Sequence, residues 1–405
     1  MTMIQGHLAI DVPKNVPVWD VDPYDPTILA SPGGYYAELR AKGPFVYLSK
    51  YSMLACGRHP VVKEVFSDWQ RFVSSRGVGL QDFKLEKPWR PPSIILETDP
   101  PDHTKARRVM MRALSPKATA ALKPGFQDAA DALVDRLLNA GEFDVVLDLA
   151  EVYPTTVFPP AVGFTTNDQR RLVDYGAMVF NALGPDNELR RKAMAMGPDI
   201  VPRITGMCKR ENLTIQGFGT VIYDAADAGE ITHDEAAMLV RSLLSAGVDT
   251  TVTGIGNLVW CLANNPGEFA RLKQDPSLAR PAFEEVLRLT SPVHSFCRTA
   301  NGDTEVSGIR IAEGTKILCV LGAANTDGAQ WPNPEAFDVS RKPAGHLALG
   351  VGVHGCVGQN LARAEVGAVL TALINKVDKI EATGPAVWRP NNAIHALDSM
   401  PVIFT

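Results

Sequence analysis

The most informative part of this chain reads Gly345-His-Leu-Ala-Leu-Gly-Val-Gly-Val-His-Gly-Cys-Val-Gly-Gln-Asn-Leu-Ala-Arg363. It places Cys356 in a glycine-rich loop directly before a predicted helix. Backbone N–H groups and the helix dipole stabilise a thiolate there, and glycines let a planar group lie against the backbone. His354 and Arg363 add positive potential. The alternative is a buried structural cysteine, the commonest state of a free cysteine.

The same loop also contains a nucleotide-binding pattern. Gly350-Val-Gly-Val-His-Gly355 matches GxGxxG, and Glu381 follows at nearly the distance of the acid in a dinucleotide site. The leading strand would be only about four residues long, however, and too few residues remain to complete a nucleotide-binding sheet. A nucleotide-dependent dehydrogenase is therefore an alternative function, and it leaves Cys356 unexplained.

Composition and cysteine spacing narrow the possible classes of protein. The 405 residues include 40 Lys and Arg against 45 Asp and Glu, which argues against nucleic-acid binding because that requires clustered basic residues. The six cysteines form no CxxC pair, so a zinc ribbon and a disulfide framework are disfavoured. The N-terminus lacks a signal pattern, and no window offers ~20 apolar residues. We therefore expect a cytoplasmic protein that is not anchored in a membrane.

Apolar periodicity predicts a mainly α fold with minor β structure. Helices are predicted over 103–140, over most of 165–290 and over about 357–376, with short strands within 303–322. A Pro- and Asn-rich irregular stretch covers 325–350. Because strands and helices do not alternate, a doubly wound sheet is excluded as the main architecture.

The segment 232–264 is predicted to form one long helix. Thr232-His-Asp-Glu235 is a capping-box start, and the helix would be roughly 45–50 Å long. Ser242, Ser245 and Asp249 share one face of a segment apolar enough to be buried. Because buried polar groups need partners, the stripe suggests a cavity for water, ligand or cofactor. Alternatively, the hydroxyls bond back to carbonyls four residues earlier and Asp249 caps a broken helix.

Glu285 and Arg288 stand three residues apart on a predicted helix, a spacing suited to an ion pair. Such spacing is common, and a solvated surface pair is the simpler interpretation when the pair is taken alone. The pair becomes informative only through its position between the long helix and the cysteine loop.

Taken together and in this order, the segments resemble the cytochrome P450 family over nearly the whole chain. Ala246-Gly-Val-Asp-Thr-Thr251 is similar to the oxygen-activation motif, and Glu285-x-x-Arg288 to the ExxR pair. Trp331-Pro-Asn-Pro-Glu-Ala-Phe337 is similar to the meander, and Gly352-x-His354-x-Cys356-x-Gly358 to the haem-ligand loop. The resemblance implies one P450 domain over 1–405, with haem buried between the long helix and the cysteine loop.

The resemblance also implies the cofactor and its surroundings. The cofactor would be haem b, with Cys356 as the axial thiolate whose electron donation favours O–O cleavage. Asp249 and Thr250 would deliver protons for oxygen activation, and Glu285 with Arg288 would be structural. The positions that match haem-binding residues are His103, Arg107, Ala246, Arg298, Leu349, His354 and Gly358. Leu349 is a departure, because the family usually has Phe there, and this puts the redox potential in question.

More narrowly, the chain is similar to soluble bacterial P450s that oxidise para-substituted benzoic acids, chiefly over 74–93. This likeness implies O-demethylation or hydroxylation of acids such as 4-methoxybenzoate. Donors suited to the carboxylate are Arg90, Ser93, Arg241, Ser242 and Ser245. Residues that would enclose the ring are Leu96, Phe180, Leu183, Val293 and Phe296.

This substrate assignment has two alternatives. The arginines would otherwise pair with surface acids, and the apolar residues would be ordinary core. Leu183 also stands where we expect the relatives to have Phe, which would loosen the pocket beside the ring. Another small aromatic or terpenoid acid is therefore a second candidate substrate.

Electrons are expected to come from a separate protein, because the chain has no flavin or iron–sulfur segment of its own. The resemblance implies a [2Fe–2S] ferredoxin with its reductase, with O2 as co-substrate and a monomeric enzyme. A helix expected near the cysteine side of the haem carries Lys105, Arg107, Arg108 and Arg112, although these residues could equally form a solvated face. A non-catalytic haem sensor is the remaining functional alternative.

Overall fold

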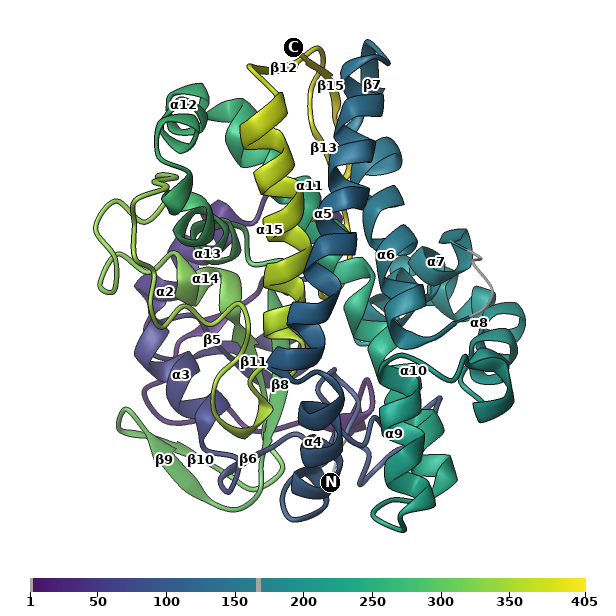
Figure 1. Ribbon diagram of the computed structural model, residues 1–405. Coiled ribbons are helices and arrows are strands. Elements are labelled where there is room, and N and C mark those ends of the chain that lie inside the picture. The colour runs from purple at the N-terminus through teal and green to yellow at the C-terminus, as the bar shows by residue number, and fades with distance from the viewer. Residues whose placement is uncertain (1–2, 165–168) are drawn as a thin grey trace.

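The computed structural model describes residues 3–164 and 169–405 (Figure 1). Its α-helices are α1 (Pro26–Ala30), α2 (Gly33–Lys42), α3 (His59–Ser67), α4 (Asp102–Ala113), α5 (Pro116–Leu138), α6 (Val152–Val162), α7 (Gln169–Asn181), α8 (Glu188–Met207), α9 (Phe218–Asp227), α10 (His233–Gly247), α11 (Asp249–Asn264), α12 (Pro266–Gln274), α13 (Ala279–Thr290), α14 (Leu321–Asn325) and α15 (Gln359–Lys376). Its strands are β1 (Met3–Ile4), β2 (His7–Leu8), β3 (Val18–Trp19), β4 (Val46–Leu48), β5 (Met53–Cys56), β6 (Phe72–Val73), β7 (Glu142–Asp144), β8 (Ser295–Ala300), β9 (Thr304–Val306), β10 (Ile309–Ile311), β11 (Lys316–Val320), β12 (Ile380–Ala382), β13 (Val387–Arg389), β14 (Ala396–Ser399) and β15 (Pro401–Phe404). The predicted mainly α class with minor β structure is confirmed.

The helix predicted over 103–140 is two helices, α4 and α5. Ser115 caps α5, because its side chain accepts a hydrogen bond from the Ala118 backbone N–H, and Pro116 takes the first helical position. Proline fits there because it lacks an N–H to donate. The prediction of one continuous helix was wrong because apolar periodicity continues across a cap. The segment predicted over 165–290 is helical from α7 to α13 with short connections, and residues 165–168 lie outside the described residues.

The long helix predicted over 232–264 is interrupted at Val248, between α10 and α11. Its predicted capping box is present at the start of α10. Next to the interruption, the hydroxyls of Thr250 and Thr251 donate to the carbonyls four residues earlier, at 2.6 and 2.9 Å. Such bonds often bend helices, and Gly247 weakens the helix further. A Cβ at Gly247 would stand 2.6 Å from the ring of Phe158, so this position brings α10 against its neighbour.

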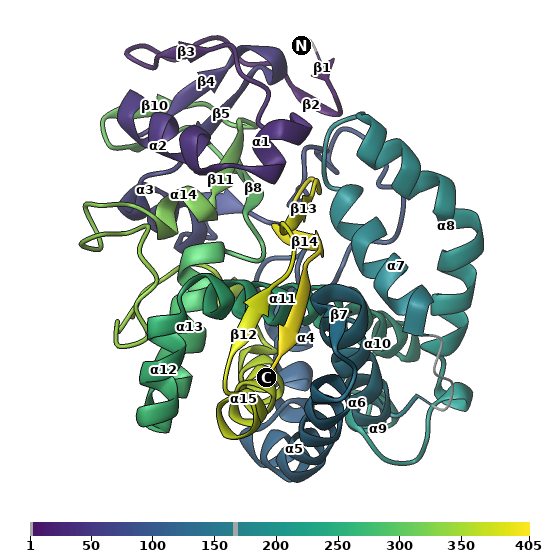
Figure 2. The same cartoon turned by 90° about the horizontal axis from the view of Figure 1, so that it is seen from above.

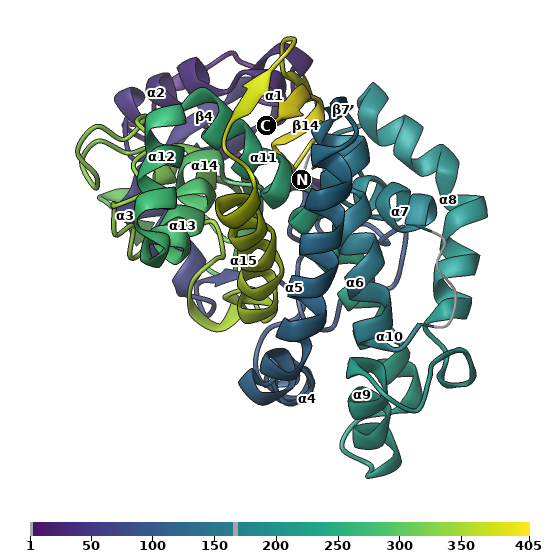
Figure 3. The same cartoon turned by 45° about the horizontal axis from the view of Figure 1, so that its top comes forward.

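In Figure 2 the six-stranded sheet lies with α1, α2, α3 and α14 at one side of the molecule, and the long helices lie at the other side, next to the small sheets of β7, β12, β13 and β14. The six-stranded sheet has the order β3-β4-β5-β11-β8-β6, with β5 parallel and β8 antiparallel to β11. The largest apolar cluster joins the long helices, and a second cluster packs against the sheet. α5 and α15, far apart in the sequence, lie side by side (Figures 1 and 3).

Glu285 and Arg288 form a fully buried ion pair on α13, with Arg288 Nε 2.7 Å from Glu285 Oε2. Arg288 also donates to the backbone carbonyls of Asn325 and Pro334, at 2.8 and 2.7 Å. Arg341 approaches the other oxygen of Glu285, at 2.8 Å. The solvated surface pair considered from the sequence is therefore wrong. The pair instead fastens the irregular 325–341 stretch to α13, since a buried charge needs such partners.

Candidate functional site

A cavity of about 270 Å³ lies between the central helices and the glycine-rich loop. Its walls come from the 90–96 segment, α7, α10, α11, β8, the loop around Cys356 and the first turns of α15. Most of the lining is apolar, and the polar groups fall into clusters described below. This combination is typical of a small-molecule site.

Cys356 lines the cavity, whereas the other five cysteines, all of them described, do not. Gly350 and Gly352 have φ angles of 68° and 70°, which favour glycine. This turn lets the Cys356 backbone N–H donate to the carbonyl seven residues earlier, at 2.7 Å. Burial raises the pKa of Cys356, and a backbone hydrogen bond with the charges of Arg107 and Arg363 lowers it by less. A bound metal ion would deprotonate this thiol outright.

Beside the cysteine loop, several buried polar atoms lack partners. His103 Nε2, Arg298 Nε and His354 Nδ1 have no hydrogen-bond partner among the described residues. The rings of His103 and His354 lie 4.5 Å apart, and His354 Nε2 lies 3.1 Å from Asp99 Oδ1. Arg107 donates to a carbonyl of the cysteine loop, at 2.5 Å. We call His103, His354, Arg298 and Arg107 the histidine cluster.

The histidine cluster is suited to an anionic acceptor. A buried donor without a partner costs about 1–3 kcal/mol, and carboxylates bound here would remove that cost. The predicted haem-binding residues that line the cavity are Arg107, Ala246, Arg298, Leu349, His354 and Gly358. His103 does not line the cavity, but its ring packs against the ring of His354, which does.

The two residues predicted to deliver protons point to different surroundings. Thr250 lines the cavity and Asp249 does not. Asp249 is fully buried, and its Oδ1 accepts a hydrogen bond from Arg389 at 3.1 Å. Its Oδ2 has no partner among the described residues. Burial raises the pKa of Asp249, and Arg389 lowers it by less. The structure therefore brings only Thr250 to the cavity.

Glu365 on α15 is a cavity residue that the sequence motifs did not single out. It is 1% exposed, and its Oε1 has no partner in the described part of the chain. Burial raises the pKa of Glu365 to about 8, against a smaller lowering by a hydrogen bond with Thr251. It is therefore mostly protonated at neutral pH. The sequence did hold a signal for its burial. Glu365 lies four residues after Leu361 and four before Val369, which places it on the buried face of α15.

Every residue predicted to contact the substrate lines the cavity. Ser93 Oγ and Ser242 Oγ lie 3.3 Å apart, and Arg241 donates to a backbone carbonyl at 3.1 Å. Arg90 donates to Glu97 Oε2 at 2.9 Å, in a pair that is almost completely buried. We call the polar set the serine cluster: Ser93, Ser242, Ser245, Arg90 and Arg241.

Glu97 was not predicted to belong to this site. Besides Arg90, it accepts a hydrogen bond from the Ser93 backbone N–H at 2.7 Å. Pairing of an arginine with an acid was anticipated, but at the surface. The acid is instead buried within the site, where it neutralises part of the charge that the sequence assigned to the substrate.

The ring-enclosing residues pack against the end of the chain. Phe180, Leu183, Val293 and Phe296 form an apolar cluster with Ala393, Ile394 and Ala396. The last three belong to the hairpin of β13 and β14 and its connecting loop. This contact makes the C-terminal segment part of the support of the cavity wall.

The model of the cytochrome P450 family matches residues 154–382. This chain belongs to the cytochrome P450 family. The resemblance inferred from the motifs is thereby confirmed, and the dehydrogenase alternative is wrong. In the described part of the chain, the GxGxxG pattern follows an irregular segment rather than a strand.

Relatives of this P450 span nearly its whole length. Cytochrome P450 CYP199A2 of Rhodopseudomonas palustris is 49% identical over 96% of this chain and 95% of its own. The beta-dihydromenaquinone-9 omega-hydroxylase of Mycobacterium tuberculosis is 30% identical over 97% of this chain and 80% of its own. Among solved structures, P450BioI in complex with a fatty-acid-ligated acyl carrier protein has a TM-score of 0.84, with 26% identity, and covers 94% of this chain and 100% of its own.

A second solved structure is that of the P450 CREJ with (4-ethylphenyl) dihydrogen phosphate. It has a TM-score of 0.82, with 25% identity, and covers 95% of this chain and 99% of its own.

P450s bind haem through a cysteine thiolate and use O2, with electrons from a redox partner, to oxidise small molecules. This protein is therefore a haem-thiolate monooxygenase. Its cavity fits the cofactor, because Cys356 lines the same space as Arg298 and His354, each of which keeps a buried nitrogen without a partner among the described residues.

The basic residues predicted to receive an electron donor lie on α4, beside α9 (Figure 1). Two of them are already paired. Lys105 lies 3.0 Å from Glu235, and Arg112 lies 2.8 Å from Glu230. The net positive charge of this face is therefore smaller than the sequence suggests.

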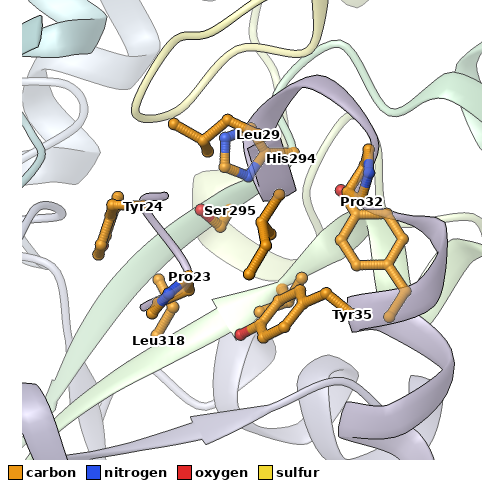
Figure 4. Close-up of a pocket in the computed structure, with 11 residues that line it drawn as sticks. Pro23, Tyr24, Leu29, Pro32, Tyr35, His294, Ser295 and Leu318 are labelled. Carbon is orange, nitrogen blue, oxygen red and sulfur yellow. The ribbon is translucent and has the colours of Figure 1, made fainter. Parts of the chain in front are cut away.

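Two further observations concern the rest of the molecule. Among the described residues, no helix has both the length and the apolar character needed to cross a bilayer. A second hollow, lined by residues such as Tyr24, Tyr35 and His294, has a volume of about 10 Å³ (Figure 4). That volume has room for about one water molecule and no organic ligand.

Proposed function

We propose that this P450 oxidises the para substituent of a small aromatic carboxylic acid, by O-demethylation or hydroxylation of compounds such as 4-methoxybenzoate. The observation that carries the proposal is the serine cluster, which faces a cavity with a mostly apolar lining. A flat ring with one charged group has the matching chemistry, since hydrogen bonds from charged donors to a carboxylate are among the strongest in proteins.

The charge of the serine cluster favours an anion. Arg90 and Arg241 supply two positive charges, and Glu97 supplies one negative charge, which leaves one positive charge unbalanced. A substrate carboxylate would balance it. Because Arg90 is already engaged by Glu97, and the Ser242 hydroxyl donates to the Met238 carbonyl at 2.9 Å, the main donors to the substrate are Arg241 and the hydroxyl of Ser93.

The apolar wall suits an aromatic ring. Phe180 and Phe296 lie in the same cluster as Leu183, and all three line the cavity. The complex of CREJ with a para-ethyl aryl phosphate supports the idea that this fold can bind a para-substituted aryl anion. Leu183 is smaller than the Phe expected there, so bulkier aromatic acids or a terpenoid acid form the second candidate class.

Within this site the residues of the chain have separate tasks. Cys356 would hold the haem and the histidine cluster its carboxylates, and the haem when bound supplies the activation of dioxygen. The serine cluster binds the acid and fixes its orientation, which raises the effective concentration of the reacting group. Thr250 Oγ1 would hold a proton on the cavity side, where its hydroxyl donates to the Ala246 carbonyl.

Binding of a charged and a neutral ligand of the same shape tests the proposal. The purified haem protein is titrated with 4-methoxybenzoate and with 4-methoxybenzamide while the Soret band is followed. We expect the acid to bind at least about tenfold more tightly, because hydrogen bonds to charged groups contribute about 1.5–3 kcal/mol. Formaldehyde should appear when electrons are supplied. Equal binding of the two ligands contradicts the acid pocket.

The proposed electron donor is a [2Fe–2S] ferredoxin with its reductase, docking beside α4. Arg108 has no ion-pair partner among the described residues, unlike Lys105 and Arg112. We therefore expect Arg108→Glu to raise the KM for ferredoxin several-fold and to leave the affinity for 4-methoxybenzoate unchanged. An unchanged KM contradicts docking at this face.

A further inference from the structure

Lys316 is a fully buried lysine at the start of β11, which lies between β5 and β8 in the six-stranded sheet. Its Nζ donates to three backbone carbonyls of the segment 76–82, those of Arg76 at 3.1 Å, Gly77 at 3.2 Å and Gln81 at 2.9 Å. A lysine ammonium has three N–H donors, so each donor has one carbonyl as its acceptor. We call residues 76–82 the lysine-bound turn.

The lysine-bound turn folds back on itself around this ammonium. Gly77 has a φ angle of 90°, and a Cβ there would lie 2.6 Å from the Gln81 carbonyl oxygen. The turn balances its own charges, because Arg76 and Asp82 form a buried ion pair in which Arg76 Nε lies 2.9 Å from Asp82 Oδ2. Buried backbone carbonyls need hydrogen-bond partners, and one side chain supplies a partner to three of them here.

The N-terminal strands β1 and β2 cover the lysine-bound turn. The Asp82 backbone N–H donates to the Gly6 carbonyl at 2.8 Å. Burial, with a smaller contribution from the positive charge of Lys316, lowers the pKa of His7 to about 4, so this ring lies close to the ammonium. Burial also lowers the pKa of Lys316, to about 8. The lysine is therefore still mostly protonated at neutral pH, with carbonyl oxygens as its partners.

The other side of the lysine-bound turn contacts the backbone of Leu183, which lines the substrate cavity. The Leu80 N–H donates to the Leu183 carbonyl at 3.1 Å. A Cβ at Gly79 would lie 2.5 Å from the same oxygen, so this close contact requires glycine. The Val78 carbonyl accepts a hydrogen bond from the N–H of Cys297 at 2.7 Å, which fixes the turn to β8 as well.

We propose that Lys316 is a positioning residue for substrate specificity, whose ammonium holds the lysine-bound turn against β11 so that the turn holds Leu183 beside the ring of the substrate. Lys316 does not line the cavity itself, and it therefore acts through Leu183. Without the ammonium, the three carbonyls must turn toward water to find partners. That movement opens the turn and releases the cavity wall at Leu183. The inference rests on the proposed function only in taking an aromatic ring as the occupant.

Substitution of Lys316 tests the link between the ammonium and the turn. We expect Lys316→Ala to raise the Kd of 4-methoxybenzoate by about fivefold or more in spectral titrations of the haem protein, because the hydrogen bonds to the turn are lost. Lys316→Gln is a milder variant that keeps two N–H donors without the charge. A lysine that only stabilises the fold predicts a lower melting temperature with unchanged affinity in both variants.

Chemical rescue distinguishes the ammonium from general packing. Propylammonium matches the side-chain atoms that Lys316→Ala deletes and carries the same three N–H donors. We expect it to restore most of the affinity of Lys316→Ala for 4-methoxybenzoate. Tetramethylammonium is the matched control, because it carries the charge but has no N–H to donate. The wild type is titrated in both salts, so that any direct effect of either cation on the haem is subtracted.

The link from the turn to Leu183 is tested separately. If Lys316 acts through Leu183, then Lys316→Ala costs little further affinity in a Leu183→Ala background, and the two substitutions are not additive. Gly79→Ala pushes the turn away from Leu183 and should weaken binding although Lys316 is intact, which tests the proposal even where Lys316→Ala does not fold. Gly302→Ala is the matched control, since a Cβ at Gly302 meets nothing within 4 Å.

A second probe separates this proposal from the proposed function. 4-Phenylimidazole fills the apolar part of the cavity without needing the serine cluster, so it reports on Leu183 even if 4-methoxybenzoate does not bind. Weaker binding of either ligand to Lys316→Ala, with recovery in propylammonium, supports the proposal. Unchanged binding of both ligands to the Lys316 variants or to Gly79→Ala overturns it, as does additivity with Leu183→Ala. Failure of 4-methoxybenzoate alone to bind the wild type contradicts only the proposed substrate.

Discussion

The histidine cluster and the serine cluster face the same cavity but differ in how completely the protein satisfies them. In the histidine cluster, His103, Arg298 and His354 each keep a buried donor or acceptor without a partner among the described residues. In the serine cluster, Arg90 is neutralised by Glu97, and Ser93 and Ser242 contact each other. The first cluster therefore leaves buried polar atoms for a bound ligand to partner, whereas the polar groups of the second are largely partnered within the chain. This difference is consistent with the haem site that the family implies and with the substrate site that we propose.

Of the substitutions that test this comparison, removal of the cysteine should have the largest effect on haem ligation and turnover. We expect Cys356→Ser to abolish the red-shifted Soret band of the reduced carbonyl complex and to abolish turnover, because serine does not supply a thiolate. Cys208→Ser is the matched control, since Cys208 is buried away from the cavity. A red-shifted band in Cys356→Ser would show that Cys356 is not the axial thiolate.

The amount of product formed per electron should depend strongly on Thr250, which lines the cavity between the two clusters. We expect Thr250→Ala to lower the product formed per electron by roughly tenfold or more, with peroxide formed instead, because the proton held at Oγ1 is lost. Peroxide and formaldehyde are measured in the same reaction. Thr253→Ala is the control, because the Thr253 hydroxyl donates to a backbone carbonyl and does not line the cavity. Unchanged coupling in Thr250→Ala contradicts the proton role.

Two substitutions in the serine cluster should have opposite effects. Ser93→Ala removes a hydroxyl donor and should weaken 4-methoxybenzoate binding by about fivefold to tenfold. Glu97→Gln removes the internal competitor for Arg90 and should tighten binding several-fold, although it lowers the stability of the fold because it breaks a buried pair. Spectral titration measures both. Unchanged or weaker binding in Glu97→Gln would show that Glu97 does not compete with the substrate, and unchanged binding in the serine variant would contradict its role as a donor.

Glu365 should make stability depend on pH. Its folded pKa of about 8 lies above the usual unfolded value of about 4.3, so the unfolded chain loses this proton first as pH rises. The stability present below the unfolded pKa is then lost progressively up to about pH 8. We expect Glu365→Gln to escape this loss, which is roughly 1 kcal/mol at pH 5 and rises to roughly 4–5 kcal/mol at pH 8. Thermal unfolding at several pH values measures it, and a difference independent of pH contradicts the buried neutral acid.

Leu183 should have the smallest effect. Leu183→Phe fills space beside the ring, and we expect about threefold tighter binding of 4-methoxybenzoate with weaker binding of bulkier aromatic acids. Phe180→Leu should shift selectivity in the opposite direction. Equal selectivity in both variants would show that these side chains do not contact the ring.

Much of the fold was predictable because its signals are local. Each of these signals involves residues that are close together in the sequence: the capping box at Thr232, the cysteine loop and the helical periodicity. The sequence offered the break at Val248 only as an alternative to one long helix, because apolar periodicity runs through it; two threonine hydroxyls do bond back beside it, but Asp249 does not cap α11. The break at Ser115 was missed for a similar reason, since a cap does not disturb the pattern of apolar residues.

In the site, residue types and their order were sufficient to identify the family, and all the residues that the narrower resemblance assigned to the substrate line the cavity. Which charges are free was decided only in three dimensions. Arg90 meets Glu97 through a turn of the loop, Asp249 meets Arg389 from 140 residues away, and Glu365 enters the cavity on the buried face of its helix. Motifs record which groups the chemistry requires, because those groups must be present in the chain. Burial and distant ion pairs determine their protonation and direction, because both depend on what the folded chain places around them.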